Sequence, residues 1–254
     1  MIRRSTTVFS LAAALGIGGS LVGIPSAVAA SDEAETAQIA ASGGASLSIA
    51  PLRTEIDSGA TGATVYLSNT SSRDMAVQAR LFAWNQVDGV DTYAPTSELT
   101  ISPSISMIPP GETQIVRILR KAGSNPGEKR FRLVVDQLPD PKSVQSGQAA
   151  TRIRFSLPVL VDRDTASAPS FAWRLKDDRL ELANTGGATA RIANVAMQTL
   201  GGEDVQLGEN TLRYVHGSST IAWPIGRGCS LGAVKIVAQI DGQTVDAQPI
   251  SACS

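Results

Sequence analysis

The sequence has very few of the side chains that hold metals or drive hydrolysis, with one histidine, His216, and two cysteines in 254 residues. A structural zinc site takes four ligands from cysteine and histidine, and an iron–sulfur cluster takes several thiolates, so neither can be assembled from this set. Serine and cysteine nucleophiles normally need a histidine base. His216 follows a predicted strand and precedes a turn, which indicates a surface residue; the alternative is the base of a secreted hydrolase. We expect no metal, no cofactor and no enzymatic activity.

The first thirty residues have the three-part pattern of a cleaved secretory signal, with Arg3 and Arg4, an uncharged run from Thr6 to Ile24, and small residues up to Ala30. A retained membrane anchor is the alternative, but glycines interrupt a run already short for a spanning helix of about 20 residues. Removing two arginines leaves 20 basic and 23 acidic residues from the 22 and 23 of the full chain. A net charge of about −3 argues against nucleic-acid binding, and we expect no membrane insertion after cleavage.

The chain after the signal is predicted to be all-β. Residues 31–44 are small and polar, which predicts a flexible N-terminus. Beyond them no helical spacing of apolar residues occurs, whereas short alternating or apolar runs recur between turn signals. The first predicted strands are Ser46–Ile56, Ala63–Asn69, Met75–Trp84, Ser97–Ser102, Thr113–Leu119, Arg130–Leu138 and Ala150–Val161. Seven strands in this length are typical of an immunoglobulin-like sandwich, here residues 45–162.

A polar segment, Asp162–Pro169, suits a hinge between domains. A second sandwich is predicted beyond it, in residues 163–254. Its predicted strands are Phe171–Leu175, Arg179–Asn184, Ala190–Gln198, Thr211–Val215, Ser219–Pro224, Ala233–Ile240 and Gln243–Ile250. The predicted fold is therefore two immunoglobulin-like β-sandwiches in series.

The two cysteines, Cys229 and Cys253, are predicted to form a disulfide. Asp241-Gly242 is a strong signal for a two-residue hairpin turn, which makes paired positions sum to 483, and the cysteines sum to 482. They would meet at the open end of this hairpin, where a closed loop contributes about 3 kcal/mol. A redox-active pair is the alternative, but the cysteines lack the close spacing of a thiol exchanger.

Two arginines, Arg53 and Arg154, lie inside predicted strands between apolar residues. A strand-embedded arginine is commonly a solvent-face residue or half of a structural ion pair. The alternative is that arginines from neighbouring strands converge on a carboxylate, which a guanidinium binds with bidentate geometry.

An ordered series of first-domain segments resembles the periplasmic chaperones of the chaperone–usher pilus pathway (PapD-like), and most closely their archaic, spore-coat-like or Csu-like branch. The segments are Ser46–Arg53, Val65–Asn69, Phe82–Trp84, Ile108–Arg117, Phe131–Pro139 and Arg154–Pro158. The resemblance covers nearly all of the first domain, whereas Leu182–Gly186 is the best match in the second. It implies a boomerang-like arrangement of two sandwiches with a cleft between them, and location in the periplasm.

The resemblance implies donor-strand complementation, in which the chaperone lends a strand to a pilin subunit that lacks its last one and delivers it to an outer-membrane usher. Pilin subunits and the usher are then the partners. Arg53 and Arg154 match the family's basic residues that anchor the subunit's C-terminal carboxylate, with Arg152 as the runner-up. Arg117 also matches a family arginine, but we expect it to be structural.

The donated side chains are the weakest part of the resemblance. The candidates are Val144, Ala149, Thr151 and Ile153, but Ser146–Ala150 is small and polar where the family carries bulky apolar residues. This departure supports a second hypothesis, an exported two-domain β-sandwich module with a structural or adhesive role and no chaperone activity. Leu157 also stands where some members carry an arginine that links the domains, so that ion pair is not expected.

Overall fold

The computed structural model describes residues 47–121, 123, 125–139, 152–208 and 210–252. In these residues the chain forms strands β1 to β19 and two single-turn 3₁₀ helices, η1 (Arg163–Thr165) and η2 (Gly228–Ser230). No helix in the described part is long and apolar enough to cross a membrane. The predicted signal, residues 1–30, and the predicted flexible segment, residues 31–44, lie outside the described residues.

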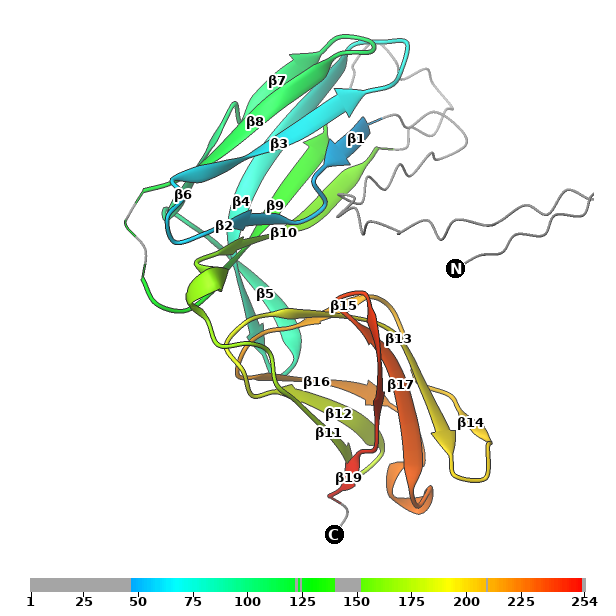
Figure 1. The fold of residues 1–254 in the computed structure, drawn as a ribbon. Helices are drawn as coiled ribbons and strands as arrows, with labels where there is room; N and C mark the ends of the chain where they lie inside the picture. The colour runs from blue at the N-terminus through cyan, green and yellow to red at the C-terminus, as the bar shows by residue number, and fades with distance from the viewer. Residues whose placement is uncertain (1–46, 122, 124, 140–151, 209, 253–254) are drawn as a thin grey trace, which may run out of the picture. The chain divides into compact units, whose positions relative to one another are not determined.

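The first sandwich packs a four-stranded sheet, ordered β1-β3-β8-β6, against a six-stranded sheet, ordered β2-β10-β9-β4-β5, with β7 also paired to β4 (Figure 1). Its strands are β1 (Leu47–Ala50), β2 (Thr54–Ile56), β3 (Gly62–Asn69), β4 (Met75–Val87), β5 (Val90–Pro95), β6 (Leu99–Ser102), β7 (Ile105–Ile108), β8 (Thr113–Arg120), β9 (Lys129–Gln137) and β10 (Arg154–Val161).

Alternation along these strands fixes which face is buried. On β9, Phe131, Leu133 and Val135 are at most 2% exposed and belong to the first core, together with Val65 and Leu67 of β3. Successive side chains of a strand point to opposite faces, so even-numbered residues of β9 lie on the outer face of the six-stranded sheet. The charged residues at even-numbered positions of β9 therefore lie on this outer face.

The second sandwich has a separate core and its own two sheets, ordered β16-β12-β11-β19 and β14-β13-β17-β18, with β15 paired to β13. Its strands are β11 (Phe171–Lys176), β12 (Arg179–Asn184), β13 (Ala190–Thr199), β14 (Asp204–Val205), β15 (Arg213–Val215), β16 (Ser219–Pro224), β17 (Val234–Ile240), β18 (Gln243–Ala247) and β19 (Ile250–Ser251). The prediction of an all-β chain of two immunoglobulin-like sandwiches is confirmed.

Several predicted strands are divided or incomplete. The predicted strand Ser46–Ile56 is two strands, because β1 pairs with β3 in one sheet and β2 pairs with β10 in the other. Three short strands, β5, β7 and β14, were not predicted, since each lies at a sheet margin and carries mostly exposed residues. In the described residues β10 begins at Arg154 instead of the predicted Ala150.

The last hairpin has the predicted register but not the predicted length. Ile240 pairs with Gln243 and Ile236 with Ala247, both summing to 483. The chain then leaves this sheet, and β19 runs parallel to β11 in the opposite one. Cys229 lies in η2, before β17 begins, so it does not extend the hairpin as predicted.

Cys229 is disulfide-bonded, but Cys253 lies outside the described residues, so their pairing stays a prediction. Two contacts favour it by another route. Cys229 N–H donates to the carbonyl of Asp177, just past β11, and β19 pairs Ser251 with Leu175 near the same end of that strand.

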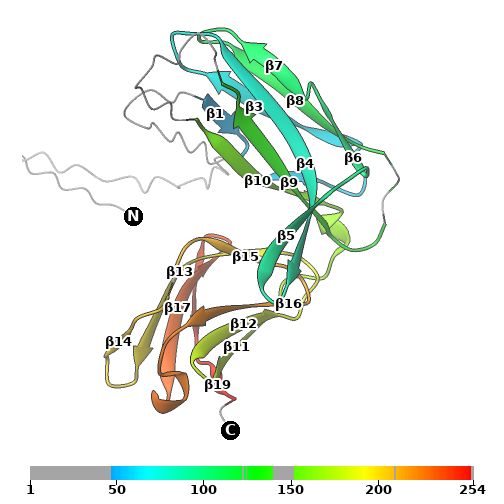
Figure 2. The ribbon, with the colours of Figure 1, turned by 180° about the vertical axis from the view of Figure 1, so that it is seen from behind.

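The described residues fall in one compact unit, Glu35–Ser254, and the β4–β5 hairpin connects the two sandwiches. Gln86 Nε2 donates to the Tyr214 carbonyl at 2.7 Å, and its Oε1 accepts from His216 N–H at 2.9 Å. The β4–β5 hairpin reaches β16 of the second sandwich (Figure 2). At its tip Gly89 has φ +76, and a Cβ there would lie 2.8 Å from the carbonyl oxygen of Thr220 in β16. A glycine is required here for both reasons.

A buried ion cluster centred on Glu128 forms the second connection. The Glu128 carboxylate, whose side chain has no exposed surface, accepts from Arg130 Nε at 2.9 Å and Arg163 Nη1 at 2.6 Å. It also accepts from the backbone N–H of Thr189 at 2.9 Å and from the Thr189 hydroxyl. An ion pair at the position of Leu157 is therefore not needed to link the sandwiches, because this cluster links them through other residues.

Candidate functional site

Arg53 lies between β1 and β2 and is bound to two carboxylates. Its guanidinium pairs with Glu55 and lies 3.6 Å from Asp241, in the turn between β17 and β18. On β2, Thr54 and Ile56 are buried while Glu55 is exposed. Arg53 therefore shares with Glu55 the outer face of the six-stranded sheet.

Arg154 is the first residue of β10 and lies opposite Asp136 of β9. Its side chain is 67% exposed and pairs with the Asp136 carboxylate, which also accepts from Arg80 Nη2 at 2.6 Å. Burial tends to raise the pKa of the Asp136 carboxyl, but the hydrogen bonds from Arg154 and Arg80 outweigh it and hold the pKa below its usual value. The exposed Arg152 lines the same shallow depression of about 570 Å³.

Arg154 and Arg53 lie near the two ends of one stretch of β10. We define this stretch, Arg154–Pro158, as the open edge. Along its whole length β10 pairs with β9, but on its other side the described residues give it only β2, opposite Val159–Val161. Extending the parallel register by one residue puts Arg53 opposite Pro158. The two predicted anchor arginines thus lie at opposite ends of the open edge, four residues or about 13 Å apart.

The backbone of the open edge has groups free for a further strand. The carbonyl of Ile153 accepts from Gln137 N–H, and hydrogen bonding alternates along an antiparallel pair. The N–H and C=O of Ser156 therefore point away from β9, toward the open side, where the C=O accepts only a long hydrogen bond of 3.5 Å from Arg132 Nη1 among the described residues.

Of the four predicted donor residues, Val144, Ala149 and Thr151 lie outside the described residues. Ile153 is described, and it is partly buried against the first core. Its role as a donated side chain stays a prediction.

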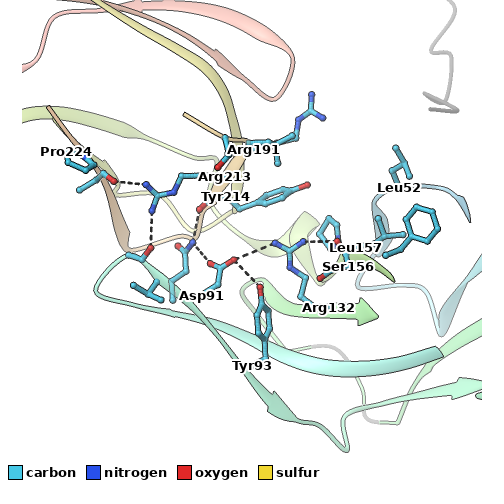
Figure 3. A pocket seen from close by; sticks show the side chains of 18 residues that line it. Leu52, Asp91, Tyr93, Arg132, Ser156, Leu157, Arg191, Arg213, Tyr214 and Pro224 are labelled. Carbon is cyan, nitrogen blue, oxygen red and sulfur yellow. Dashed lines mark hydrogen bonds and ion pairs between the residues drawn. The ribbon is translucent and has the colours of Figure 1, made fainter. Parts of the chain in front are cut away.

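A pocket of about 840 Å³ lies at the end of the open edge and is lined by both sandwiches (Figure 3). Leu52, Phe155, Leu157 and Pro158 form part of its wall, and Arg132 and Tyr93 contribute polar groups. The Arg132 guanidinium stacks on Trp84, 3.7 Å from the ring centroid, and lies 3.7 Å from the Asp91 carboxylate. Asp91 in turn accepts from the Tyr93 hydroxyl at 3.2 Å.

Sequence reasoning did not select Arg132. The signal was present, because Arg132 lies between Phe131 and Leu133 on a predicted strand, which is the criterion that selected Arg53 and Arg154. Its burial could not be predicted, since it depends on Tyr214 and Trp84 from distant parts of the chain.

The prediction that His216 is a surface residue was wrong. It is 2% exposed, and its ring packs edge-on against Trp84 with centroids 4.2 Å apart. Burial, with the charges of Arg130 and Arg132, lowers its pKa from 6.5 to about 3. The imidazole is therefore neutral at physiological pH.

Gly228–Gly232 has the Gly-x-Ser-x-Gly spacing of a hydrolase nucleophile elbow, but it does not form one. An elbow is a sharp turn from a strand into a helix, whereas η2 here leads into strand β17. Among the described residues there is also no group of three or more histidine, cysteine, aspartate or glutamate side chains that could hold a metal ion.

Residues 46–163 match the family model described as "Pili and flagellar-assembly chaperone, PapD N-terminal domain". No curated protein sequence matches the chain. The match of residues 46–163 to a family of assembly chaperones agrees with the prediction that the chain is not an enzyme.

Solved structures of pilus chaperones share the fold. The CsuC–CsuE chaperone–tip adhesion subunit complex of Acinetobacter baumannii Csu pili matches at 23% identity and TM-score 0.64, over 82% of this chain and 99% of that one. The SafA pilin–SafB chaperone complex of Salmonella enterica matches at 17% and 0.60, over 83% and 98%. The E. coli chaperone DraB matches at 19% and 0.57, over 80% and 95%.

The family match and the fold agree with each other. The matched segment contains β1 to β10, all the described strands of the first sandwich, and the structural matches extend over both sandwiches. Residues 46–163 thus match the PapD N-terminal domain, and both sandwiches have the fold of the solved pilus chaperones.

Proposed function

We propose that this chain is a periplasmic chaperone that binds pilin subunits by donor-strand complementation and delivers them to an outer-membrane usher. Its mature part consists of a flexible segment, residues 31–44, a subunit-binding sandwich, residues 45–162, and a second sandwich, residues 163–254. The signal at residues 1–30 directs it to the periplasm. The family match and the likeness to chaperone–subunit complexes support this proposal.

The open edge of β10 is the observation that carries the proposal. A strand with unpaired backbone groups is a template for a further strand, and proteins use such edges to bind extended segments. Here the edge is five residues long and lies in a domain of the matched family. A subunit strand added beside β10 would bond to the backbone of Ser156, while Arg53 and Arg154, with Arg152 as runner-up, are the candidates for its terminal carboxylate.

The open edge is tested by a substitution that removes one backbone N–H from it and keeps the hydrogen bonds between β10 and β9. In Ser156→Pro the lost N–H is one that points to the open side, and proline is tolerated on edge strands. The matched control is Ser156→Ala, which removes the hydroxyl and keeps the N–H. Each variant is exported together with a pilin subunit, and the subunit recovered with the chain is measured.

We expect Ser156→Pro to reduce subunit recovery at least fivefold and Ser156→Ala to leave it unchanged. Arg53→Ala should also abolish recovery, whereas Arg117→Ala, at an exposed position of β8 in the other sheet, should not. Failure of the unaltered chain to retain any subunit would refute the chaperone function and favour an exported structural or adhesive module. Equal recovery with the two Ser156 variants would refute strand addition at this edge.

A further inference from the structure

His216 lies where the second sandwich meets the β4–β5 hairpin of the first. It follows the last residue of β15, its ring packs edge-on against Trp84 with centroids 4.2 Å apart, and its backbone N–H donates to Gln86 Oε1 at 2.9 Å. Tyr214 completes the contact, because its carbonyl accepts from Gln86 Nε2 at 2.7 Å and its ring packs edge-on against Trp84. We call these four residues, Trp84, Gln86, Tyr214 and His216, the hairpin contact.

The charges that act on the His216 imidazole are positive. Arg130 and Arg132, both on β9, lie close enough to lower its pKa. The Arg132 guanidinium carbon lies 5.0 Å from the centroid of the Tyr214 ring, so this cation is packed into the hairpin contact itself. Arg191 of β13 lies opposite Tyr214 in the sheet and adds to the positive field there. A proton on His216 would therefore add one more positive charge to a site that already holds several.

No carboxylate in the described part of the chain pairs with the His216 imidazole. Glu128 and Asp91, the acids beside the two β9 arginines, pair with those arginines instead, at 2.9 Å and 3.7 Å. The other side chains of the hairpin contact are uncharged, since burial raises the pKa of the Tyr214 phenol. The Nε2 atom of His216 is buried without a hydrogen-bond partner among the described residues. A proton on this imidazole would therefore have no counter-charge.

Burial and these charges make a proton on His216 costly while the hairpin contact is closed. They lower its pKa from 6.5 to about 3. If the hairpin moved away from β15, the imidazole would meet water and regain its ordinary pKa. A group whose pKa is lower in the closed form stabilises that form above its ordinary pKa, and this stabilisation is lost as pH falls toward the lower pKa. The ratio of open to closed contact should therefore rise about 25-fold from pH 7 to pH 5.

We infer that the hairpin contact is an acid-sensitive switch, which holds the β4–β5 hairpin against β15 at neutral pH and opens when His216 binds a proton. None of its four residues belongs to either hydrophobic core cluster, so the contact can open while both sandwiches stay folded. The Glu128 cluster remains as a second connection, so opening loosens the joint between the sandwiches without separating them. The inference does not depend on the proposed chaperone function.

The protonation of His216 can be followed without ambiguity, because the chain has only one histidine. The imidazole resonances of the untagged mature chain are recorded by NMR as the pH is lowered from 7.5 to 4. We expect no titration around pH 6.5 and a midpoint below pH 5, since the proton binds only when the hairpin contact opens. A midpoint of 6 or above would show an imidazole already in water and would overturn the inference.

Hydrogen exchange of two indole N–H groups shows whether the hairpin contact opens before the chain unfolds. Trp84 and Trp223 are matched reporters, since each is 1% exposed and has a buried Nε1 without a hydrogen-bond partner among the described residues. Trp223, however, belongs to the second core. At pH 5 we expect the Trp84 indole to exchange at least tenfold faster than the Trp223 indole. Corrected for the intrinsic effect of pH, exchange at Trp84 should be about 25-fold faster at pH 5 than at pH 7.

Two variants assign the pH effect to His216. His216→Phe keeps an aromatic ring against Trp84 but binds no proton, so the acceleration of Trp84 exchange from pH 7 to pH 5 should fall below threefold. Tyr214→Phe is the matched control, which changes a ring of the same contact and should keep the full effect. Equal exchange of the two indoles at pH 5 in the unaltered chain would mean that the contact opens only on unfolding and would overturn the inference. A full pH effect in a folded His216→Phe chain would overturn it as well.

Discussion

Replacing Glu128 by glutamine should destabilise the chain strongly, although the change only replaces one carboxylate oxygen by an amide NH₂ group. Four donors converge on the Glu128 carboxylate, two from arginines and two from Thr189 of the second sandwich. Glutamine keeps one acceptor oxygen and brings an NH₂ group toward the arginines. It leaves Arg130, whose side chain is 20% exposed, without its carboxylate partner, and it leaves Arg163, which is 17% exposed, only the longer pair with Glu55 at 3.7 Å.

The magnitude follows from the loss of one partner in a buried ion cluster, which costs about 3–5 kcal/mol. Because the glutamine oxygen retains some of the hydrogen bonds, we expect the lower limit, about 3 kcal/mol. With a urea m-value of about 2 kcal/mol/M, the unfolding midpoint should fall by about 1.5 M. The Thr189 amide, which donates to Glu128, should also exchange its hydrogen faster than in the unaltered chain.

The matched control is Glu98→Gln, the same substitution at an exposed pair. Lys129 Nζ lies 2.5 Å from Glu98, but the two side chains are 37% and 51% exposed. An exposed pair contributes at most about 1 kcal/mol, so its midpoint should hardly move. Equal effects of the two substitutions on the midpoint, or unchanged exchange at Thr189 in Glu128→Gln, would refute the stabilising role of the cluster.

Three other predictions concern His216, the β4–β5 hairpin tip and the disulfide. The pKa of His216 is about 3 in the folded chain and about 6.5 in the unfolded chain, so its neutral form contributes stability that is complete above pH 6.5 and lost as pH falls. His216→Phe should therefore remove about 2 kcal/mol of the difference in unfolding free energy between pH 7 and pH 5. An equal pH dependence in both chains would contradict this. Gly89→Ala should cost about 2 kcal/mol or more in urea unfolding, whereas Gly111→Ala, with φ +75 and no atom within 4 Å of the new Cβ, should cost only the strain of about 1 kcal/mol. Peptide mapping of the non-reduced mature chain should find Cys229 linked to Cys253, and a free thiol at either position would contradict the pairing.

The sequence predicted the fold where alternation was strong and failed where strands were short or shared between sheets. Strands such as β3, β8 and β12 have an apolar residue at every second position, so their extent was predicted to within a residue. The segment Ser46–Ile56 reads as one apolar run, and nothing local shows that its halves pair with different sheets. Pairing partners far along the chain decide this, and they are not encoded in the segment itself.

The site was predicted in part for the same reason. Arg53 and Arg154 could be placed on one sheet from their motifs, and the structure puts them at the two ends of one edge. Their separation, and the pairing of Arg154 with Asp136, depend on strand register and could not be read from spacing. His216 and Arg132 are buried against Trp84 in a cluster to which the second sandwich contributes both His216 and Tyr214.

Glu128 and Arg132 show how differently two charges of similar burial can serve one protein. Both residues are 8% exposed, yet Glu128 accepts four close hydrogen bonds from three residues, whereas Arg132 has long contacts and an Nε without a hydrogen-bond partner within the described part of the chain. Removing a buried charge whose partners are all in place is costly, whereas removing one with unmet hydrogen-bond donors costs little. Arg132→Gln should therefore lower the unfolding free energy by less than about 1 kcal/mol, far less than Glu128→Gln. A loss of 3 kcal/mol or more in urea unfolding would mean that Arg132 is a structural residue, and the reasoning from its unmet hydrogen bonds would be wrong.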